Sequence, residues 1–289
     1  MEESGKNPQG AQTEGQGEPQ QKPQGLQMQN DPDMCKRDDG RLNKIRCYPL
    51  YRSTIILLLI AAAIGIAEFS DPVGAIVSLA ICTISALIAD FAIFYALTKK
   101  QKISENAVNT GLIIGAILSP VAPLWQLCLL SVLAVASKYV LRHKGMPLLN
   151  PAALAVVVGG LAFGLYGEWW AANERVVFLI AAIILAWKLN KWIMEIAFVV
   201  AWAIAHIALS TYSGALVGHP VFLVPAYFMA FMLLEPKTSP MKNSRQAIYG
   251  AIVGLLAAST FAIDMAVDNL ALVLLVGNIA KKAMDMAKI

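Results

Sequence analysis

Charged residues are the first thing that this sequence has little of. Asp, Glu, Lys and Arg make up 15% of the 289 residues, whereas hydrophobic residues make up 57%. A soluble domain carries about a quarter charged residues, and here the shortage is concentrated after residue 53. The composition therefore argues against an ordinary soluble protein and predicts an all-α polytopic membrane protein. We expect the protein to be embedded in the lipid bilayer and to bind no nucleic acid.

Cysteine and histidine are too few and too scattered to build a metal centre. The 4 cysteines include no C-x-x-C pair, and the 3 histidines do not cluster. The chain also lacks a P-loop, a G-x-G-x-x-G fingerprint and a Ser-His-Asp constellation. We therefore expect no metal site and see no self-contained catalytic site, so whether the chain acts as an enzyme stays open.

Residues 1–50 differ in composition from the rest of the chain. Up to about residue 47 they are rich in Gln, Gly, Pro, Asp, Glu and Lys, a composition that cannot bury enough apolar surface to offset its ordering entropy. We predict a disordered cytoplasmic tail with no signal-peptide core. Basic residues between Lys36 and Arg52 gather before the first apolar run, which favours a cytoplasmic amino terminus. Residues 51–289 form the predicted transmembrane domain.

About ten apolar segments follow, several of them shorter than the roughly 20 residues needed to cross a bilayer. They span residues 54–68, 73–98, 106–119, 124–141, 148–166, 175–189, 192–211, 220–235, 246–263 and 267–284. If they alternate from a cytoplasmic start, most Lys and Arg residues fall in cytoplasmic turns, and Asp and Glu dominate the opposite turns. This division predicts a multi-pass protein of the cytoplasmic (inner) membrane with both termini in the cytoplasm.

Three of these segments carry glycines four residues apart. The pairs are Gly111 with Gly115, Gly160 with Gly164, and Gly250 with Gly254. Small faces of this kind let neighbouring helices approach closely. We expect these glycines to serve helix packing and not ligand binding.

Two proline-containing runs interrupt the hydrophobic pattern. They are Leu118-Ser119-Pro120-Val121-Ala122-Pro123 and Leu234-Glu235-Pro236-Lys237-Thr238-Ser239-Pro240. Proline breaks regular helix, and broken helix within a membrane is tolerated where it is buried in protein or lines a polar cavity. Matching breaks indicate an inverted repeat with a site between its halves, here roughly residues 51–166 and 167–289. The alternative is two unrelated loops that both contain proline.

Ionisable residues inside the apolar segments are few, and such residues mark a pathway or a buried pair. Asp90 and Glu235 are candidates for an ion or solute path, or for structural pairing with a Lys or Arg. We expect Lys138 and Glu195 to extend to the cytoplasmic edge. We expect His206 to be satisfied by helix carbonyls or water.

These motifs together resemble the membrane subunit family shared by the D subunit of the Rnf electron-transport complex and the B subunit of the sodium-pumping NADH:quinone reductase. The residues that carry the resemblance are Thr110-Gly111, the run from Leu118 to Trp125, Lys138, Gly145, Asn150-Pro151-Ala152, the run from Glu235 to Pro240, Asn243, Arg245, Tyr249-Gly250, Asn278 and Asp285. The RnfD/NqrB resemblance implies ten helices in two inverted halves, similar in fold to urea transporters. It also implies other Rnf-type membrane subunits as partners and electron transfer coupled to movement of Na⁺ or H⁺.

The sequence departs from this family at the flavin attachment site. The resemblance implies FMN linked covalently to a Thr on a long outward loop after Asn-Pro-Ala, but here the loop is reduced to about residues 166–175 and contains no Ser or Thr. The nearest approximation, Ser213-Gly214-Ala215-Leu216, has Leu in the acceptor position. We therefore expect no covalent FMN. A non-covalent FMN or riboflavin is compatible with polar groups at a helix amino end.

The candidate site residues fall into two sets. The cofactor-binding set is Thr110, Gly111, Asn150 and Pro151, and the ion or solute path is Asp90, Pro120, Pro123, Glu235, Pro236 and Asn278. The leading hypothesis is a membrane subunit of an Rnf-type complex. A stand-alone channel or transporter for a small polar solute on the same fold is the alternative, and a scaffold subunit without either activity is a third.

Overall fold

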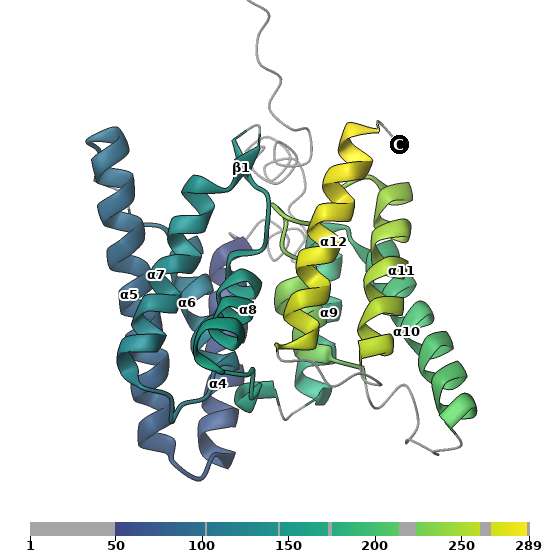
Figure 1. The fold of residues 1–289 in the computed structure, drawn as a ribbon, viewed down its shortest axis with the longest axis horizontal. Coiled ribbons are helices and arrows are strands. Elements are labelled where there is room, and N and C mark those ends of the chain that lie inside the picture. The colour runs from purple at the N-terminus through teal and green to yellow at the C-terminus, as the bar shows by residue number, and fades with distance from the viewer. Residues whose placement is uncertain are drawn as a thin grey trace, which may run out of the picture. The chain divides into compact units, whose positions relative to one another are not determined.

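The computed structural model describes residues 50–101, 103–143, 145–172, 175–213, 224–260 and 267–287, and within them the chain is built almost entirely from helices (Figure 1). The elements are α4 (Leu50–Glu68), α5 (Pro72–Thr98), α6 (Glu105–Ile117), α7 (Leu124–Val140), β1 (Arg142–His143), β2 (Met146–Pro147), α8 (Pro151–Phe163), η1 (Trp170–Ala172), α9 (Arg175–Leu189), α10 (Trp192–Ser213), η3 (Phe228–Leu233), α11 (Asn243–Thr260) and α12 (Asn269–Met286). The predicted all-α class is confirmed, with one short antiparallel hairpin, β1–β2, as an addition. The predicted tail, residues 1–50, lies outside the described residues except for Leu50, which begins α4.

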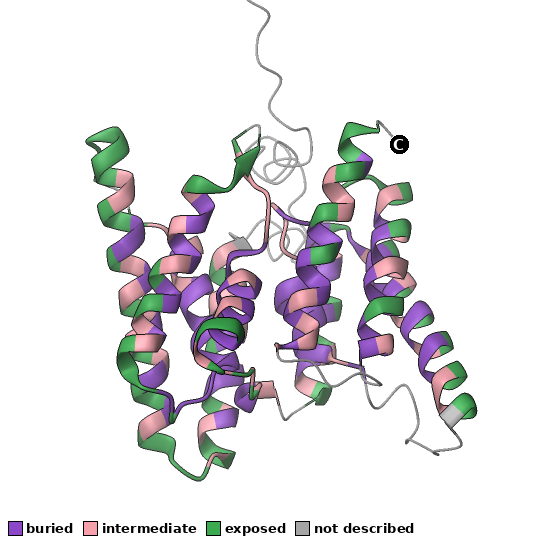
Figure 2. Cartoon of the chain, viewed as in Figure 1, coloured by how far each residue is buried: buried purple, intermediate pink, exposed green. Residues whose placement is uncertain are grey.

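Each of the ten predicted apolar segments overlaps one described helix of six residues or more. In the described part of the chain, three helical stretches are long and apolar enough to cross a membrane: Tyr51–Glu68, Pro72–Thr98 and Trp192–Tyr212. Exposed residues recur along the helices (Figure 2). Large apolar side chains exposed on these three stretches include Val73, Ile88 and Ile204. Such a surface is typical of helices in contact with lipid tails.

The packed helix pairs of the two halves correspond to one another. In the first half α4 packs against α6, and in the second half α9 packs against η3. In the same way, the contact of α5 with α7 corresponds to the contact of α10 with α11. The contact of α7 with α8 corresponds to that of α11 with α12. Between the halves, α4 packs against α9 and α8 against α12, so equivalent helices meet each other. Contacts between equivalent elements are what a two-fold relation produces, and they support the predicted repeat.

Basic residues predominate at one end of the helices, where Asp285 pairs with Arg245 and Glu105 with Arg52. The β1–β2 hairpin and the carboxyl end of α12 lie at one edge of the view in Figure 1, and the α4–α5 connection lies at the other. The first edge carries Arg142, Lys281 and Lys282, whereas the second carries Glu68 and Asp71. This division follows the predicted positive-inside pattern.

The glycine pairs differ in what they do. A Cβ on Gly111 would lie 2.5 Å from the Thr83 Cα of α5, and a Cβ on Gly250 would lie 2.2 Å from the Met194 carbonyl oxygen of α10. Close packing at Gly111–Gly115 and Gly250–Gly254 is therefore confirmed. Gly164 instead ends α8 in the left-handed conformation, with φ of 65° and open space around it. The prediction for the Gly160–Gly164 pair is wrong at Gly164, because the helix stops there.

Candidate functional site

The turn after η3 and the start of α8 place the Glu235 carboxylate next to the Asn150 side-chain amide. The π-helix η3 ends at Leu233, and Glu235 follows it in the proline-containing turn. Asn150 is the N-cap of α8, where its Oδ1 accepts a hydrogen bond from the Ala153 backbone N–H at 3.0 Å. Asn favours this position, and Pro151 begins the helix without losing a bond. Isolated π-helical turns occur frequently at functional sites.

Asn150, Glu235 and Asn278 form a hydrogen-bonded network between the two halves. Asn150 Nδ2 donates to Glu235 Oε2 at 2.7 Å, and the Asn150 backbone N–H donates to Asn278 Oδ1 at 2.6 Å. Asn278 Nδ2 in turn donates to the Thr238 carbonyl oxygen at 3.2 Å and to the Tyr249 hydroxyl at 3.1 Å. Because Asn150 and Asn278 are 2% and 1% exposed, these bonds form away from bulk water and fix the interface strongly.

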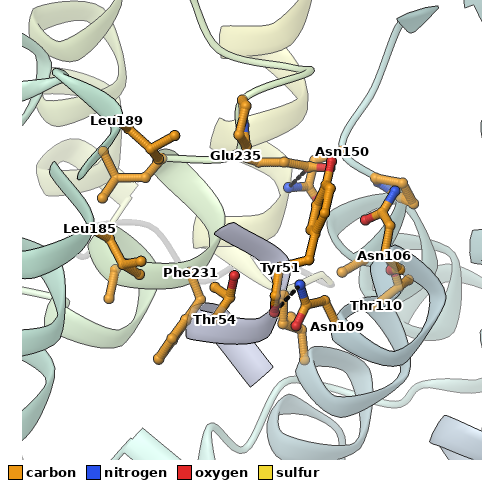
Figure 3. A pocket seen from close by; sticks show the side chains of 16 residues that line it. Tyr51, Thr54, Asn106, Asn109, Thr110, Asn150, Leu185, Leu189, Phe231 and Glu235 are labelled. Carbon is orange, nitrogen blue, oxygen red and sulfur yellow. Dashed lines mark hydrogen bonds between the residues drawn. The ribbon is translucent and has the colours of Figure 1, made fainter. Parts of the chain in front are cut away.

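A cavity adjoins this network (Figure 3). In the figure, polar side chains of α6 lie on one side of it and Leu185, Leu189 and Phe231 lie on the other, with Tyr51 between them. The cavity encloses about 40 Å³, which is room for a few water molecules. It is lined by Tyr51, Thr54, Asn106, Asn109, Thr110, Ile113, Asn150, Pro151, Ala152, Leu185, Leu189, Ala230, Phe231, Leu234, Glu235 and Pro236.

The side-chain oxygen of Asn109, a residue that lines this cavity, accepts no hydrogen bond within the described residues. Asn109 is 6% exposed, and its Nδ2 donates to the Tyr51 carbonyl oxygen at 3.4 Å. Its Oδ1 has no hydrogen-bond partner within the described residues. Glu235 is the acidic residue among the lining side chains. An orphaned amide oxygen and a carboxylate in one cavity are suited to a cation or a hydrogen-bond donor.

Two buried lysines, Lys138 and Lys191, form hydrogen bonds with residues at or next to the cavity. Lys138 donates to Thr110 Oγ1 at 2.6 Å and to the Asn106 carbonyl oxygen at 3.3 Å. Because Lys138 is 6% exposed, it does not extend to the membrane edge, and that prediction is wrong. Lys191, between α9 and α10, donates to the Leu234 carbonyl oxygen and to Ser239 Oγ. Burial lowers the pKa of Lys191 to about 7.

Five of the predicted site residues meet at the cavity. The predicted residues that line it are Thr110, Asn150, Pro151, Glu235 and Pro236. Asn278 does not line it but accepts a hydrogen bond from the backbone N–H of Asn150. Thr110 lies within α6 and not at a helix start, because the helix begins at Glu105. The predicted helix amino end is therefore supplied at Asn150 alone.

Four predicted site residues lie elsewhere. Gly111 is not a lining residue, since it faces α5. Pro120 and Pro123 are not lining residues either, although they interrupt the helix between α6 and α7 as predicted. Asp90 is buried and accepts a hydrogen bond from the Tyr139 hydroxyl at 2.9 Å, so it links α5 to α7.

The first bend has its freed backbone groups satisfied by the protein itself. The Ile117 carbonyl oxygen accepts hydrogen bonds from the backbone N–H groups of Glu168 and Trp169, at 2.8 and 3.0 Å. Trp170 Nε1 donates to the Gly115 carbonyl oxygen at 2.8 Å. These backbone groups of the first bend are therefore occupied within the protein and are not free to bind a ligand.

Eleven of the lining residues were not predicted, and four of these are polar: Tyr51, Thr54, Asn106 and Asn109. Asn106, Asn109 and Thr110 are spaced three and one residues apart, so they share one face of an otherwise apolar helix. That polar face was a usable signal. Tyr51 offered none, because its place beside Glu235 depends on how α4 packs.

A second cavity, of about 380 Å³, has Asn278 in its lining. Its lining comes from the β1–β2 hairpin, the segment after it and the carboxyl end of α12. Asn278 thus contacts the larger cavity and bonds Asn150, which lines the smaller one. The larger cavity is lined by His143, Met146, Pro147, Leu148, Asn278, Lys281, Lys282, Asp285 and Met286.

Comparison with known proteins finds a family match over part of the chain. Residues 43–174 match the model of the NQR2, RnfD, RnfE family. No curated protein matches the chain significantly. The matched stretch contains α4 to α8, including Thr110, Lys138 and Asn150. The protein is therefore a helical membrane protein whose resemblance to the NQR2, RnfD, RnfE family is confirmed over residues 43–174.

Proposed function

We propose that this chain is a membrane subunit of an Rnf-type electron-transport complex, in which electron transfer is coupled to movement of Na⁺ or H⁺. The match to the NQR2, RnfD, RnfE family supports a role beside other membrane subunits. The subunit resides in the cytoplasmic membrane with both termini in the cytoplasm. It contributes a binding site for the moving ion.

The observation that carries this proposal is the Glu235 carboxylate in a small cavity between the two halves. Glu235 Oε2 accepts hydrogen bonds from Asn150 Nδ2 at 2.7 Å and from Thr238 Oγ1 at 3.2 Å. The unpartnered Asn109 Oδ1 lines the same cavity. An intramembrane carboxylate with nearby neutral oxygens can hold a cation or a proton during transfer.

The ion would enter from the basic side of the membrane domain. The larger cavity leads to Asn278, and Asn278 is hydrogen bonded to Asn150. We propose that this pair of amides separates the cytoplasmic cavity from the Glu235 cavity. Opening of the Asn150–Asn278 contact would then connect the two.

A flavin does not fit the Glu235 cavity as the chain is folded here. The family resemblance implies covalently linked FMN, and the flavin compatible with this chain is a non-covalent FMN or riboflavin. The cavity has room for a few water molecules, which is far less than the fused rings of an isoalloxazine occupy. We therefore assign no electron-transfer step to this cavity and route only ion movement through it.

Purification from native membranes tests the proposed assignment. The chain is tagged at its carboxyl end, solubilised in mild detergent and analysed for co-purifying subunits and for an acid-released flavin spectrum. Co-purification of redox subunits and electron-driven ion uptake by the reconstituted complex are the expected results. A chain that purifies alone, without cofactor-bearing partners, would contradict the proposal.

The size of the cavity favours a second candidate function. A space for a few water molecules also suits a small polar solute, and the Asn109, Thr110 and Asn150 side chains can bond one. A stand-alone channel or transporter would be colourless and would pass the solute in liposomes without any electron donor. Electron-independent flux by the purified chain distinguishes it from the subunit of a redox complex.

A further inference from the structure

One face of α10 carries a buried carboxyl that the Glu235 site does not use. Glu195 is 6% exposed and is not among the residues that line either cavity. Phe198, less than one turn further along the helix, contacts Phe228 of η3, with ring centroids 5.9 Å apart. The next turns carry Trp202 and His206, whose rings stack at 6.0 Å. Glu195 therefore lies on a face that is directed into the protein and is otherwise aromatic.

The Glu195 carboxyl is not neutralised by any described neighbour. Its Oε1 has no hydrogen-bond partner, and no Lys, Arg or His forms an ion pair with it within the described residues. The expectation that Glu195 extends to the membrane edge is thus wrong, because the side chain is buried.

The titratable groups on the elements around α10 have other contacts. On α11, Arg245 pairs with Asp285, and the Tyr249 hydroxyl accepts from Asn278. Before α10, Lys191 donates to Leu234 and Ser239. The remaining titratable groups on α9, η3, the adjoining turns and α10 itself are Arg175, Lys188, Tyr227, Glu235, Lys237, Lys242, His206 and Tyr212, and within the described residues none is a hydrogen-bond or ion-pair partner of Glu195.

The surroundings of Glu195 favour binding of a proton over binding of a metal cation. An ionised carboxylate that is buried without a partner costs several kcal/mol, which favours its neutral form. Hard metal cations require several oxygen ligands, and apolar helix faces do not supply them. A proton neutralises the carboxyl with a single bond and needs no further ligand. We propose that Glu195 is a proton-binding site in the membrane domain, separate from the Glu235 cavity and independent of its function.

Carbodiimide labelling of the full-length protein in liposomes tests this proposal. A protonated carboxyl transfers its proton to a carbodiimide nitrogen while its oxygen adds to the central carbon. The O-acylisourea then rearranges to a stable N-acylurea, so that one reagent molecule is added and no oxidant or reductant is needed. With dicyclohexylcarbodiimide near neutral pH, peptide mass spectrometry should find the adduct on Glu195, decreasing as the pH is raised and unaffected by Na⁺.

Matched variants make the result specific. Glu195→Gln should lose this adduct, Glu195→Asp should keep it, and His206→Gln should leave it unchanged. Infrared spectra should also show a protonated carboxylic acid band that disappears in Glu195→Gln. Protection by Na⁺, or loss of a carboxylate band instead of a carboxylic acid band in Glu195→Gln, would overturn the proposal. If Glu195→Gln fails to fold, the labelling of wild type and Glu195→Asp decides, and unlabelled Glu195 in both would overturn it.

Discussion

The side-chain amide of Asn150 donates to the carboxylate of Glu235 at 2.7 Å, although the two residues are 85 positions apart in the sequence. The same side chain caps α8 through its oxygen atom. One residue thus begins a helix of the first half and holds the carboxylate at the end of η3 in the second half. The Glu235 cavity depends on this contact between the halves.

Substitution of Asn278 by Ala should destabilise the membrane domain. The change leaves the Asn150 backbone N–H without its acceptor and removes the donor to the Tyr249 hydroxyl. Buried groups left unpaired cost about 1 to 3 kcal/mol each. The free energy of unfolding, measured on the detergent-solubilised protein, should therefore be lower for Asn278→Ala than for wild type. Ile279→Ala, at a neighbouring residue that is 58% exposed, is the control, and equal stability of the two variants would contradict the described network.

Much of this network was visible in the sequence because local rules place its members. Asn150 followed by Pro151 is a strong local signal for a helix start. Glu235 before Pro236 marks a helix that cannot continue. The repeat pattern then indicated that a site would form between the halves. These features depend on a few consecutive residues, so tertiary packing did not alter them.

Other features could not be predicted because they depend on which neighbour a residue meets. Asp90 stays a predicted path residue, and its hydrogen bond from Tyr139 of α7 was not indicated by the sequence. Thr110 was expected at a helix start, whereas the helix extends back to Glu105. Lys138 was expected at the membrane edge, but Thr110 and Asn106 give it buried partners. None of these partners is fixed by sequence spacing.

Substitution of Gly250 by Ala should destabilise the packing of α10 against α11. The new Cβ would lie 2.2 Å from the Met194 carbonyl oxygen, which is backbone and cannot rotate away. Overpacking of this kind costs about 1 to 3 kcal/mol. Gly159→Ala is a matched helical control, because its Cβ would meet a movable methyl group of Leu130 at 3.0 Å. Thermal unfolding in detergent should place Gly250→Ala clearly below Gly159→Ala, and the reverse order would refute the described packing.

The stability of the protein should depend on pH through Lys191. Burial lowers the pKa of Lys191 from 10.5 to about 7 in the folded protein. Between these two values the unfolded chain binds more protons than the folded chain, so the contribution of Lys191 to stability rises with pH and is lost as pH falls toward 7. Lys191→Met removes this contribution. The difference in unfolding free energy between wild type and Lys191→Met should change across that window, and parallel pH profiles would argue against a buried, neutral Lys191.

The purified polypeptide should carry no covalently attached flavin. The segment from residue 166 to 175 contains no Ser or Thr that could form the phosphoester. The intact mass of the denatured chain, measured after removal of small molecules, should equal the mass of the sequence. An additional mass equal to FMN would show that an acceptor residue exists elsewhere in the chain.

Ion uptake by the reconstituted complex, with Glu235→Gln compared with Glu168→Gln, tests the central claim most directly. Glu168 is an exposed carboxyl after α8 and does not line either cavity, so it controls for the loss of one negative charge. Gln keeps an oxygen that can accept from Asn150, so Glu235→Gln should assemble normally. The proposed role of Glu235 predicts that electron-driven ion uptake falls by an order of magnitude or more in Glu235→Gln and stays unchanged in Glu168→Gln. Wild-type uptake by an assembled Glu235→Gln complex would contradict it.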